Sequence, residues 1–145
     1  NWYNYRVTVL DARPDLRIRT ASLNDYSVYQ NQTITVYFYT RNYGYLGFST
    51  DFYNKFYMCA STATATSSCT YVNQYYITAN YGGLNSETYY SVTFKVPAGT
   101  SNSNSGTRYV RIVADANGNI SESNESNNIY NIDNNNYFYN KFESI

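Results

Sequence analysis

The chain has 145 residues, a length typical of a single domain that can bury a substantial hydrophobic core. Ten basic residues balance ten acidic ones, so net charge gives no reason to expect binding to nucleic acid or to an anionic membrane surface. The sequence has no histidine, the commonest general base and metal ligand, and no apolar run approaches the ~20 residues that span a bilayer.

The first ten residues alternate in the manner of a β-strand, with apolar side chains on one face and polar ones on the other. Two interpretations of this strand are open. It pairs with an edge of its own sheet, or it inserts as an added strand into the sandwich of a neighbouring subunit. In the second case the subunit contacts are Trp2, Tyr3, Tyr5, Val7 and Val9, and repeating the contact head to tail builds a filament.

Apolar and polar residues alternate with a period of two along the rest of the chain, whereas no window of helical length shows the helical period of about 3.6 residues. Turn-forming residues separate these segments, as in 41–44, 81–84 and 98–106. Seven or more short strands with regular turns predict an all-β antiparallel β-sandwich. The predicted inward-facing residues are Leu16, Ile18, Ile34, Val36, Phe38, Phe52, Phe56, Met58, Tyr90, Val92, Phe94, Val96, Val110, Ile112 and Ala114.

Tyrosine is unusually abundant, with 20 copies, and several tyrosines fall on the outward faces of the predicted strands. Such residues can stack on sugar rings, pack against neighbouring subunits or cover a sheet face, because each joins a large apolar ring to a polar tip. A surplus spread over many strands favours subunit packing, whereas a sugar site would more naturally group two or three aromatic residues in loops. The outward tyrosines are Tyr37, Tyr39, Tyr53, Tyr57, Tyr89 and Tyr109.

Cys59 and Cys69 flank a spacer of small residues that can close a loop without strain. A disulfide between them would stabilise the fold by about 3 kcal/mol on the chain-entropy model. The alternative is a pair of free thiols in a cytosolic protein. Asn31, Asn119 and Asn124 each begin an Asn-x-Ser/Thr motif and are candidate glycosylation sites, a feature of extracellular proteins.

A predicted strand over Tyr109–Ala114 runs into Asp115–Asn128, a segment rich in Asn and Ser that would close an antiparallel sheet. Its Asn117-Gly118 pair predicts a type I′ hairpin turn, because both residues tolerate positive φ. Oxygens of the kind that calcium prefers come from Asp115, Asn117, Asn119, Glu122 and Glu125. The spacing does not match an EF-hand, since the glycine falls at the fourth loop position. The alternative is a turn whose acids face water.

Several segments follow one another in a characteristic order: Pro14-Asp15-Leu16, then Asn42-Tyr43-Gly44 after the strand Thr33–Thr40, then Val92–Pro97, then the Asp115–Asn128 hairpin. Over roughly residues 14–132 this order resembles a CARDB domain, the cell-adhesion-related module of bacterial and archaeal surface proteins. The resemblance implies a seven-stranded immunoglobulin-like sandwich, a surface location and no enzymatic activity. The cysteine-bounded loop and the many tyrosines are not typical of that family.

The sequence therefore divides into a strand extension over 1–13, a sandwich over 14–133, and a tail or edge strand over 134–145 that contains Tyr137, Tyr139 and Phe142. We expect a secreted, non-enzymatic structural or adhesive protein of the cell surface, self-assembling through its N-terminal strand into a homo-oligomer or filament. The competing interpretation is a monomeric module that binds carbohydrate or another surface polymer. Neither requires a cofactor, and calcium is the only ion that the sequence suggests. No carboxylates are evidently paired across a cleft, and no base is suggested for a serine nucleophile.

Overall fold

The structure is a computed structural model that describes residues 11–97, 106–132 and 137–139, and strands dominate it as predicted. One short 3-10 helix, η1 (Thr66–Ser68), is the exception, and none of the described helical structure is long and apolar enough to cross a membrane. The strands are β1 (Leu16–Leu23), β2 (Ser27–Tyr29), β3 (Thr33–Asn42), β4 (Phe52–Cys59), β5 (Thr70–Ile77), β6 (Glu87–Lys95), β7 (Gly106–Thr107), β8 (Tyr109–Val113), β9 (Ile129–Ile132) and β10 (Tyr137–Tyr139).

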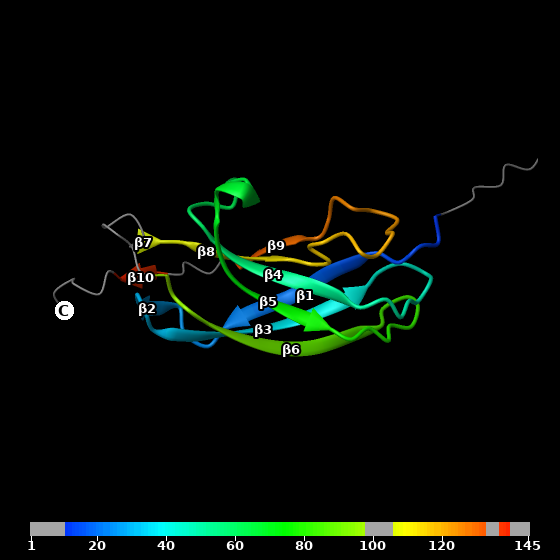
Figure 1. Cartoon of the computed structure of the whole chain (residues 1–145), viewed down its shortest axis with the longest axis horizontal. Helices are drawn as coiled ribbons and strands as arrows, with labels where there is room; N and C mark the ends of the chain where they lie inside the picture. The colour runs from blue at the N-terminus through cyan, green and yellow to red at the C-terminus, as the bar shows by residue number, and fades with distance from the viewer. Residues whose placement is uncertain (1–10, 98–105, 133–136, 140–145) are drawn as a thin grey trace, which may run out of the picture.

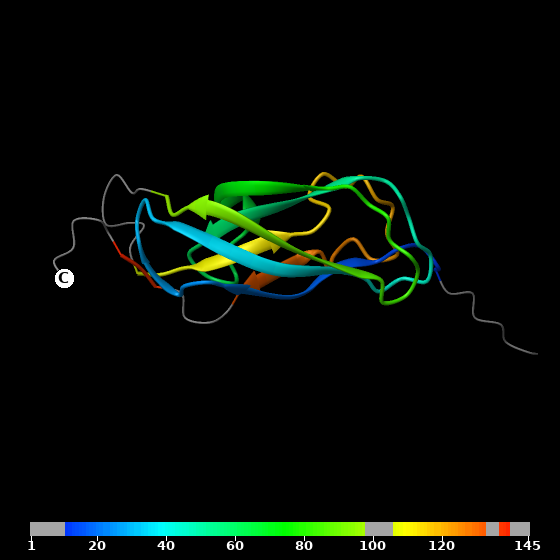
Figure 2. The same cartoon turned by 90° about the horizontal axis from the view of Figure 1, so that it is seen from below.

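Two antiparallel sheets form the sandwich, one with strand order β1-β3-β6 and the other with order β5-β4-β8-β9. Figure 1 shows β3 and β6 low in the view and β8 and β9 high, and Figure 2 turns the β3–β6 side toward the reader. A small third sheet, ordered β2-β10-β7, lies at one end of the long axis. In it β10 runs parallel to β2 and antiparallel to β7, so this part of the C-terminal segment has a strand on each side.

The hydrophobic core lies between the two large sheets and is built by the predicted alternation. Ile34, Val36 and Phe38 of β3 are fully buried, and the residues between them are partly exposed. Phe38 meets Phe56 of the opposite sheet edge to face, with ring centroids 5.2 Å apart. Each large apolar side chain buried in this way contributes roughly 1.5–3 kcal/mol, which explains why period-two burial determines the fold.

A β-bulge interrupts the alternation of β1. Ile18 pairs with Thr40 and Thr20 pairs with Tyr39, so Arg19 is an extra residue on its strand. A bulge re-aims side chains, and here it brings both Arg19 and Thr20 to the outer face of the sheet. The sequence signals this bulge, because the apolar residues that are buried in β1 fall at even positions before it and at odd positions after it.

The predicted type I′ turn at Asn117-Gly118 is wrong, although β8 and β9 do pair as antiparallel neighbours. The turn instead spans Asp115 to Gly118, whose N–H donates to the Asp115 carbonyl at 2.9 Å. Among the described non-glycine residues of this segment, Asp115 alone has positive φ, at 47°, while Gly118 has φ of 66°. Residues 114–128 join the two strands, so the connection is much longer than a two-residue hairpin. The extra length lets this segment also contact β1 of the other sheet.

Candidate functional site

The segment joining β8 to β9, residues 114–128, is called the acidic loop here, and two of its three acids point inward. Asp115 is 4% exposed and Glu122 is 2% exposed. The Asp115 carboxylate accepts the backbone N–H of Asn119 at 2.9 Å on Oδ1 and that of Ile120 at 3.0 Å on Oδ2. Glu125 is exposed, and its Oε1 accepts the backbone N–H of Glu122 at 3.0 Å. The expectation of acids facing water therefore holds for Glu125 alone.

Glu122 ties the acidic loop to the first strand of the opposite sheet. Its Oε1 accepts the backbone N–H of Leu16 at 2.6 Å, and its Oε2 accepts the side-chain amide of Asn128 at 2.6 Å. The Ser123 N–H adds a bond to the carbonyl of Pro14 at 2.9 Å. The loop thus joins the start of β1 to the β8–β9 pair, which is a structural role.

This burial changes the proton affinity of both inward-facing acids. Burial raises the pKa of Glu122 to about 8, against the two hydrogen bonds that its carboxyl group accepts, and the carboxyl groups of Glu125 and Asp115 add to the rise. Burial likewise raises the pKa of Asp115, opposed by its two backbone N–H donors. The amide oxygen of Asn128 is buried beside them and has no hydrogen-bond partner within the described part of the chain.

The structure does not bring the predicted calcium ligands into a metal site. Both oxygens of Asp115 and both of Glu122 already accept N–H donors, and the side chains of Asn117 and Asn119 are exposed. Within residues 11–97 and 106–132, no three or more His, Cys, Asp or Glu side chains are grouped so as to hold a metal. Calcium takes about six to eight oxygen ligands, so the donors as folded do not fit it.

Cys59 and Cys69 form a disulfide, with Cα atoms 4.6 Å apart, and the loop between them contains η1. This loop covers Arg111 on the outer face of β8. Arg111 is 2% exposed, and it donates to Asn131 Oδ1 at 2.8 Å, to Thr66 Oγ1 at 3.0 Å and to a backbone carbonyl of the loop at 3.1 Å. Arg111 is therefore buried although it lies on the outer face of the sheet, opposite the core-facing Val110 and Ile112.

The three candidate glycosylation residues, Asn31, Asn119 and Asn124, are all exposed. Asn31 lies between β2 and β3 with φ of 69°, and the other two lie on the acidic loop. The side chain of Asn124 accepts both the N–H and the hydroxyl of Ser126, the serine of its own motif. Exposure is compatible with modification at all three positions, and modification itself stays a prediction.

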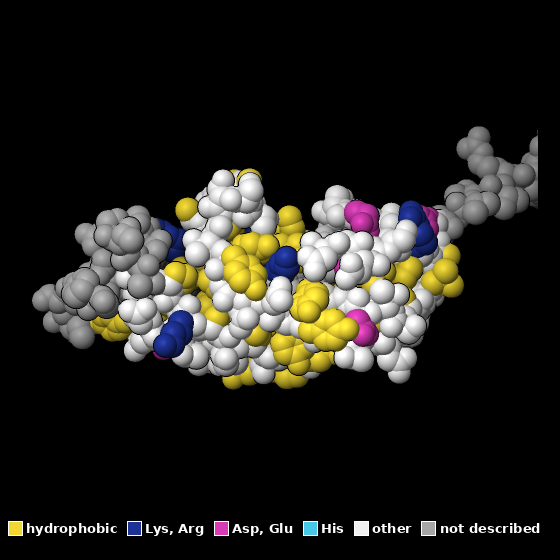
Figure 3. All heavy atoms as spheres, viewed as in Figure 1, with side chains coloured by type: hydrophobic (Ala, Val, Ile, Leu, Met, Phe, Trp, Pro, Cys, Tyr) yellow, Lys and Arg dark blue, Asp and Glu magenta, His cyan; other side chains and the backbone are white. Residues whose placement is uncertain are grey.

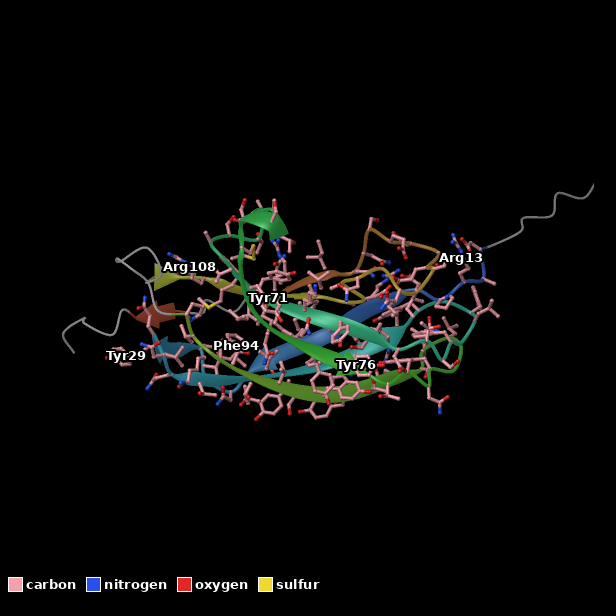
Figure 4. All side chains as sticks on the ribbon, viewed as in Figure 1. Arg13, Tyr29, Tyr71, Tyr76, Phe94 and Arg108 are labelled. Carbon is pink, nitrogen blue, oxygen red and sulfur yellow. A yellow bond between two sulfur atoms is a disulfide. The ribbon has the colours of Figure 1, made fainter. Side chains whose placement is uncertain are left out.

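The outer face of the β1–β3–β6 sheet carries an open groove of about 290 Å³, which we call the tyrosine groove. Its lining residues are Thr20, Ala21, Ser22, Tyr37, Tyr39 and Tyr89. Tyr39 and Tyr89 are paired across β3 and β6 with ring centroids 4.7 Å apart, and the Tyr37 ring lies within 4° of parallel to Tyr89 at 6.4 Å. Tyr89 is 54% exposed. Figure 4 shows aromatic side chains standing out from the lower side of β6.

A network of paired charges borders the tyrosine groove. The Arg19 guanidinium lies over the Tyr39 ring, 4.4 Å from its centroid, and its Nε donates to Glu87 Oε2 at 2.7 Å. Arg41 donates to the same carboxylate oxygen at 2.8 Å. The pKa of Glu87 is held below its usual value by these hydrogen bonds, that from Arg41 first and that from Arg19 second. The network fixes the Tyr39 ring, while the lining of the groove itself carries no charge.

The two long sides of the sandwich differ in charge. Charged residues are missing from β5 and occur only at the two ends of β6, whereas β1 carries Arg17 and Arg19. β5 and β6 are the edge strands on one side, and the Asn73 side chain of β5 donates to the Thr93 carbonyl of β6 at 2.7 Å. Exposed tyrosines also lie on β5, and Figure 3 shows hydrophobic side chains gathered over the middle of this face with charged groups scattered singly.

The described chain starts and ends at opposite ends of the long axis. Figure 4 places Arg13 at one end and Tyr29 and Arg108 at the other, where β10 also lies. The candidate subunit contacts Trp2, Tyr3, Tyr5, Val7 and Val9 lie outside the described residues. The starting end carries exposed Tyr45 and Leu46, and the Leu46 N–H donates to the Ala12 carbonyl at 2.9 Å.

The sequence model of the CARDB family matches residues 13–132. A search of curated proteins found no match. The fold is similar to a crystal structure of the CARDB domain of the PF1109 protein from Pyrococcus furiosus in complex with di-metal ions, with a TM-score of 0.58 and 16% identity over 85% of this chain and 93% of that one. A solution structure of the PF1109 CARDB domain from the same organism gives a TM-score of 0.57 and 18% identity over 89% of this chain and 98% of that one.

Proposed function

Because the chain belongs to the CARDB family, whose members are surface- and adhesion-related domains without catalytic activity, we propose that it is an extracellular structural protein that assembles head to tail by strand addition. The observation that supports this most is the position of the two ends. Residue 11 leaves the sandwich at one end of the long axis, and β10 lies at the opposite end. Copies stacked end to end would then bring the N-terminal segment of one subunit to the far end of the next.

The N-terminal segment suits such a contact in length and in pattern. Ten extended residues span at most ~36 Å, which is comparable to the length of one strand of this sandwich. The segment alternates polar residues with Tyr3, Tyr5, Val7 and Val9, so one face can be buried while the other remains exposed to solvent. A contact of this kind is heterologous, since the donor and acceptor surfaces differ, and its repetition gives an open filament.

The acceptor that fits best is the β5–β6 side. An edge strand offers unpaired N–H and C=O groups to an incoming strand, and natural proteins protect such edges with charges or prolines. Neither device occurs between Glu87 and Lys95 of β6 or anywhere in β5. The opposite side is less suitable, because β1 carries two arginines.

Deleting residues 1–9 tests the proposal. We expect a folded, monomeric protein, with an unchanged circular dichroism spectrum and no filaments in negative-stain electron micrographs. A synthetic peptide of residues 1–10 should then bind the truncated protein with 1:1 stoichiometry. Filaments of the truncated form would refute the proposal.

A matched pair of substitutions separates the pattern of the strand from its mere presence. Val7→Asp places a charge on the apolar face and should abolish assembly, because a carboxylate would enter an apolar contact. Thr8→Asp places the same charge on the polar face and should leave filaments intact. Equal effects of the two variants would show that the alternation is irrelevant to assembly.

A further inference from the structure

The geometry of the tyrosine groove points to a second activity that does not depend on strand addition, and we propose that it binds a neutral carbohydrate. Three outward tyrosines come together here from two strands, and the neighbouring strand β1 adds the hydroxyl groups of Thr20 and Ser22. All the lining side chains except Ala21 lie on the outer face, away from the core, so packing of the core does not account for this grouping.

The lining matches the surface of a sugar. A pyranose ring has an apolar face of C–H groups and a rim of hydroxyls, and tyrosine offers a complementary apolar ring with a polar tip. The rings of Tyr37 and Tyr89 are stacked, with planes within 4° of parallel and centroids 6.4 Å apart, so each holds the orientation of the other. Thr20 and Ser22 lie opposite Tyr39 and Tyr37 in the strand register, and their hydroxyls can donate to and accept from sugar hydroxyls.

The lining of the groove favours a neutral ligand, because it carries no charged side chain. Arg19 directs two of its five N–H donors to the oxygens of Glu87 and lies over the Tyr39 ring, so its charge is already paired with a carboxylate. Arg41 shares the same carboxylate and does not line the groove. A carboxylate- or sulfate-bearing sugar would have to compete with Glu87 for these donors, whereas a neutral sugar leaves the network as it is.

The groove is prepared for binding before a ligand arrives. Its tyrosines are anchored on paired strands, Tyr39 is fixed beneath Arg19, and the bulge in β1 turns Thr20 toward the outer face. A preformed site loses less conformational entropy on binding than a mobile one. A volume of about 290 Å³ lies at the lower limit of ligand pockets, about 300–1,000 Å³, and suits one or two sugar rings along a longer polymer.

Titration calorimetry of the full chain with neutral hexasaccharides of glucose, mannose and N-acetylglucosamine tests the proposal, with hexasaccharides of galacturonic acid as the acidic arm. We expect saturable binding of at least one neutral probe and none of the acidic one. Tyr89→Ala should weaken binding by about five- to tenfold, the size of one aromatic stacking contact. Tyr71→Ala is the matched control, since Tyr71 on β5 is 51% exposed but lies outside the groove, and it should leave binding unchanged.

Three results would each overturn the inference: no binding of any neutral probe at millimolar concentration, binding of the acidic probe alone, or equal binding by the wild type and Tyr89→Ala. Loss of filaments on Tyr89→Ala without any sugar binding would also overturn it and would instead assign the groove to contact between copies of this chain. Circular dichroism of both variants checks that they fold, so that a loss of binding reports on the groove.

Discussion

The acidic loop and the tyrosine groove both gather oxygen-bearing side chains, and they differ in where those oxygens point. In the loop, the carboxylates of Asp115 and Glu122 accept four hydrogen bonds from N–H groups of the same chain. In the groove, Tyr89 is 54% exposed, and the hydroxyl groups of Thr20 and Ser22 are on exposed residues. Composition identifies clusters of polar side chains. Which of them can bind a ligand depends on whether their polar atoms already form hydrogen bonds within the fold.

The largest expected effect on stability concerns Glu122, which fastens the acidic loop to β1. Glu122→Ala removes the acceptor of the Leu16 N–H and of the Asn128 amide, leaving two buried donors without a partner. Each such donor costs about 1–3 kcal/mol, so we expect the free energy of unfolding to fall by about 3 kcal/mol in urea titrations. Glu125→Ala is the control, because Glu125 is exposed, and it should cost less than about 1 kcal/mol. Similar losses in both variants would show that the loop does not fasten β1.

A second effect is the dependence of stability on pH. The folded pKa of Glu122 is raised from 4.5 to about 8, and the pKa of Asp115 is raised as well. The folded chain therefore holds protons that the unfolded chain releases, so stability is greatest below the unfolded pKa and falls as pH rises from about 4.5 to about 8. The sequence has no histidine, so no other side chain ordinarily titrates in this window.

We expect a loss on the order of 2–4 kcal/mol between about pH 5 and about pH 8, measured by urea titration at both values. Glu122→Gln removes the titrating group and should flatten most of this slope, leaving the smaller part due to Asp115. The outcome against this account would be a wild-type stability that rises over the same interval, because it would mean that the two N–H donors outweigh burial.

The sequence predicted the features that depend on neighbouring residues and missed those that depend on residues far apart in the chain. Alternation is local, so the burial of Ile34, Val36 and Phe38 was readable from the sequence. The bond from Leu16 to Glu122 joins residues 106 positions apart, and no local pattern announces it. The same limit explains the misplaced turn, because the course of the acidic loop depends on its contact with β1.

The groove was also only half predictable. The outward orientation of Tyr37, Tyr39 and Tyr89 was expected, but their meeting depends on the register that pairs Tyr39 with Tyr89. The phase shift between Ile18 and Ala21 was the available signal for the bulge that opens the groove on β1. Arg111 was not predictable as a buried residue, because it lies on the outer face of its sheet and is buried only by the disulfide loop that covers it.

A smaller effect concerns the stability of the groove itself. Tyr89→Ala should lower the free energy of unfolding by less than about 1 kcal/mol, because an exposed cross-strand aromatic pair contributes little beyond local contact. Phe38→Ala, on the inner face of the neighbouring strand, should cost about 4 kcal/mol, since it leaves a cavity in the core. Urea titration measures both. A loss for Tyr89→Ala near that of Phe38→Ala would mean that the groove is a structural element and not an open binding surface.

The smallest expected effect is that of a chelator on the acidic loop. If the carboxylates are fully engaged by N–H donors, EDTA should leave the thermal midpoint unchanged within about 1 °C, and added calcium should not raise it. An ion that binds only the native state, at a free concentration of a hundred times its Kd, would raise the free energy of unfolding by about 2.7 kcal/mol. That corresponds to a rise of several degrees in the thermal midpoint of a domain of this size. Glu122→Gln serves as the control, because a real site would lose its calcium response in this variant. A calcium-dependent rise in the wild type that this substitution removes would mean that the loop opens to bind the ion, and the contrast with the groove would then disappear.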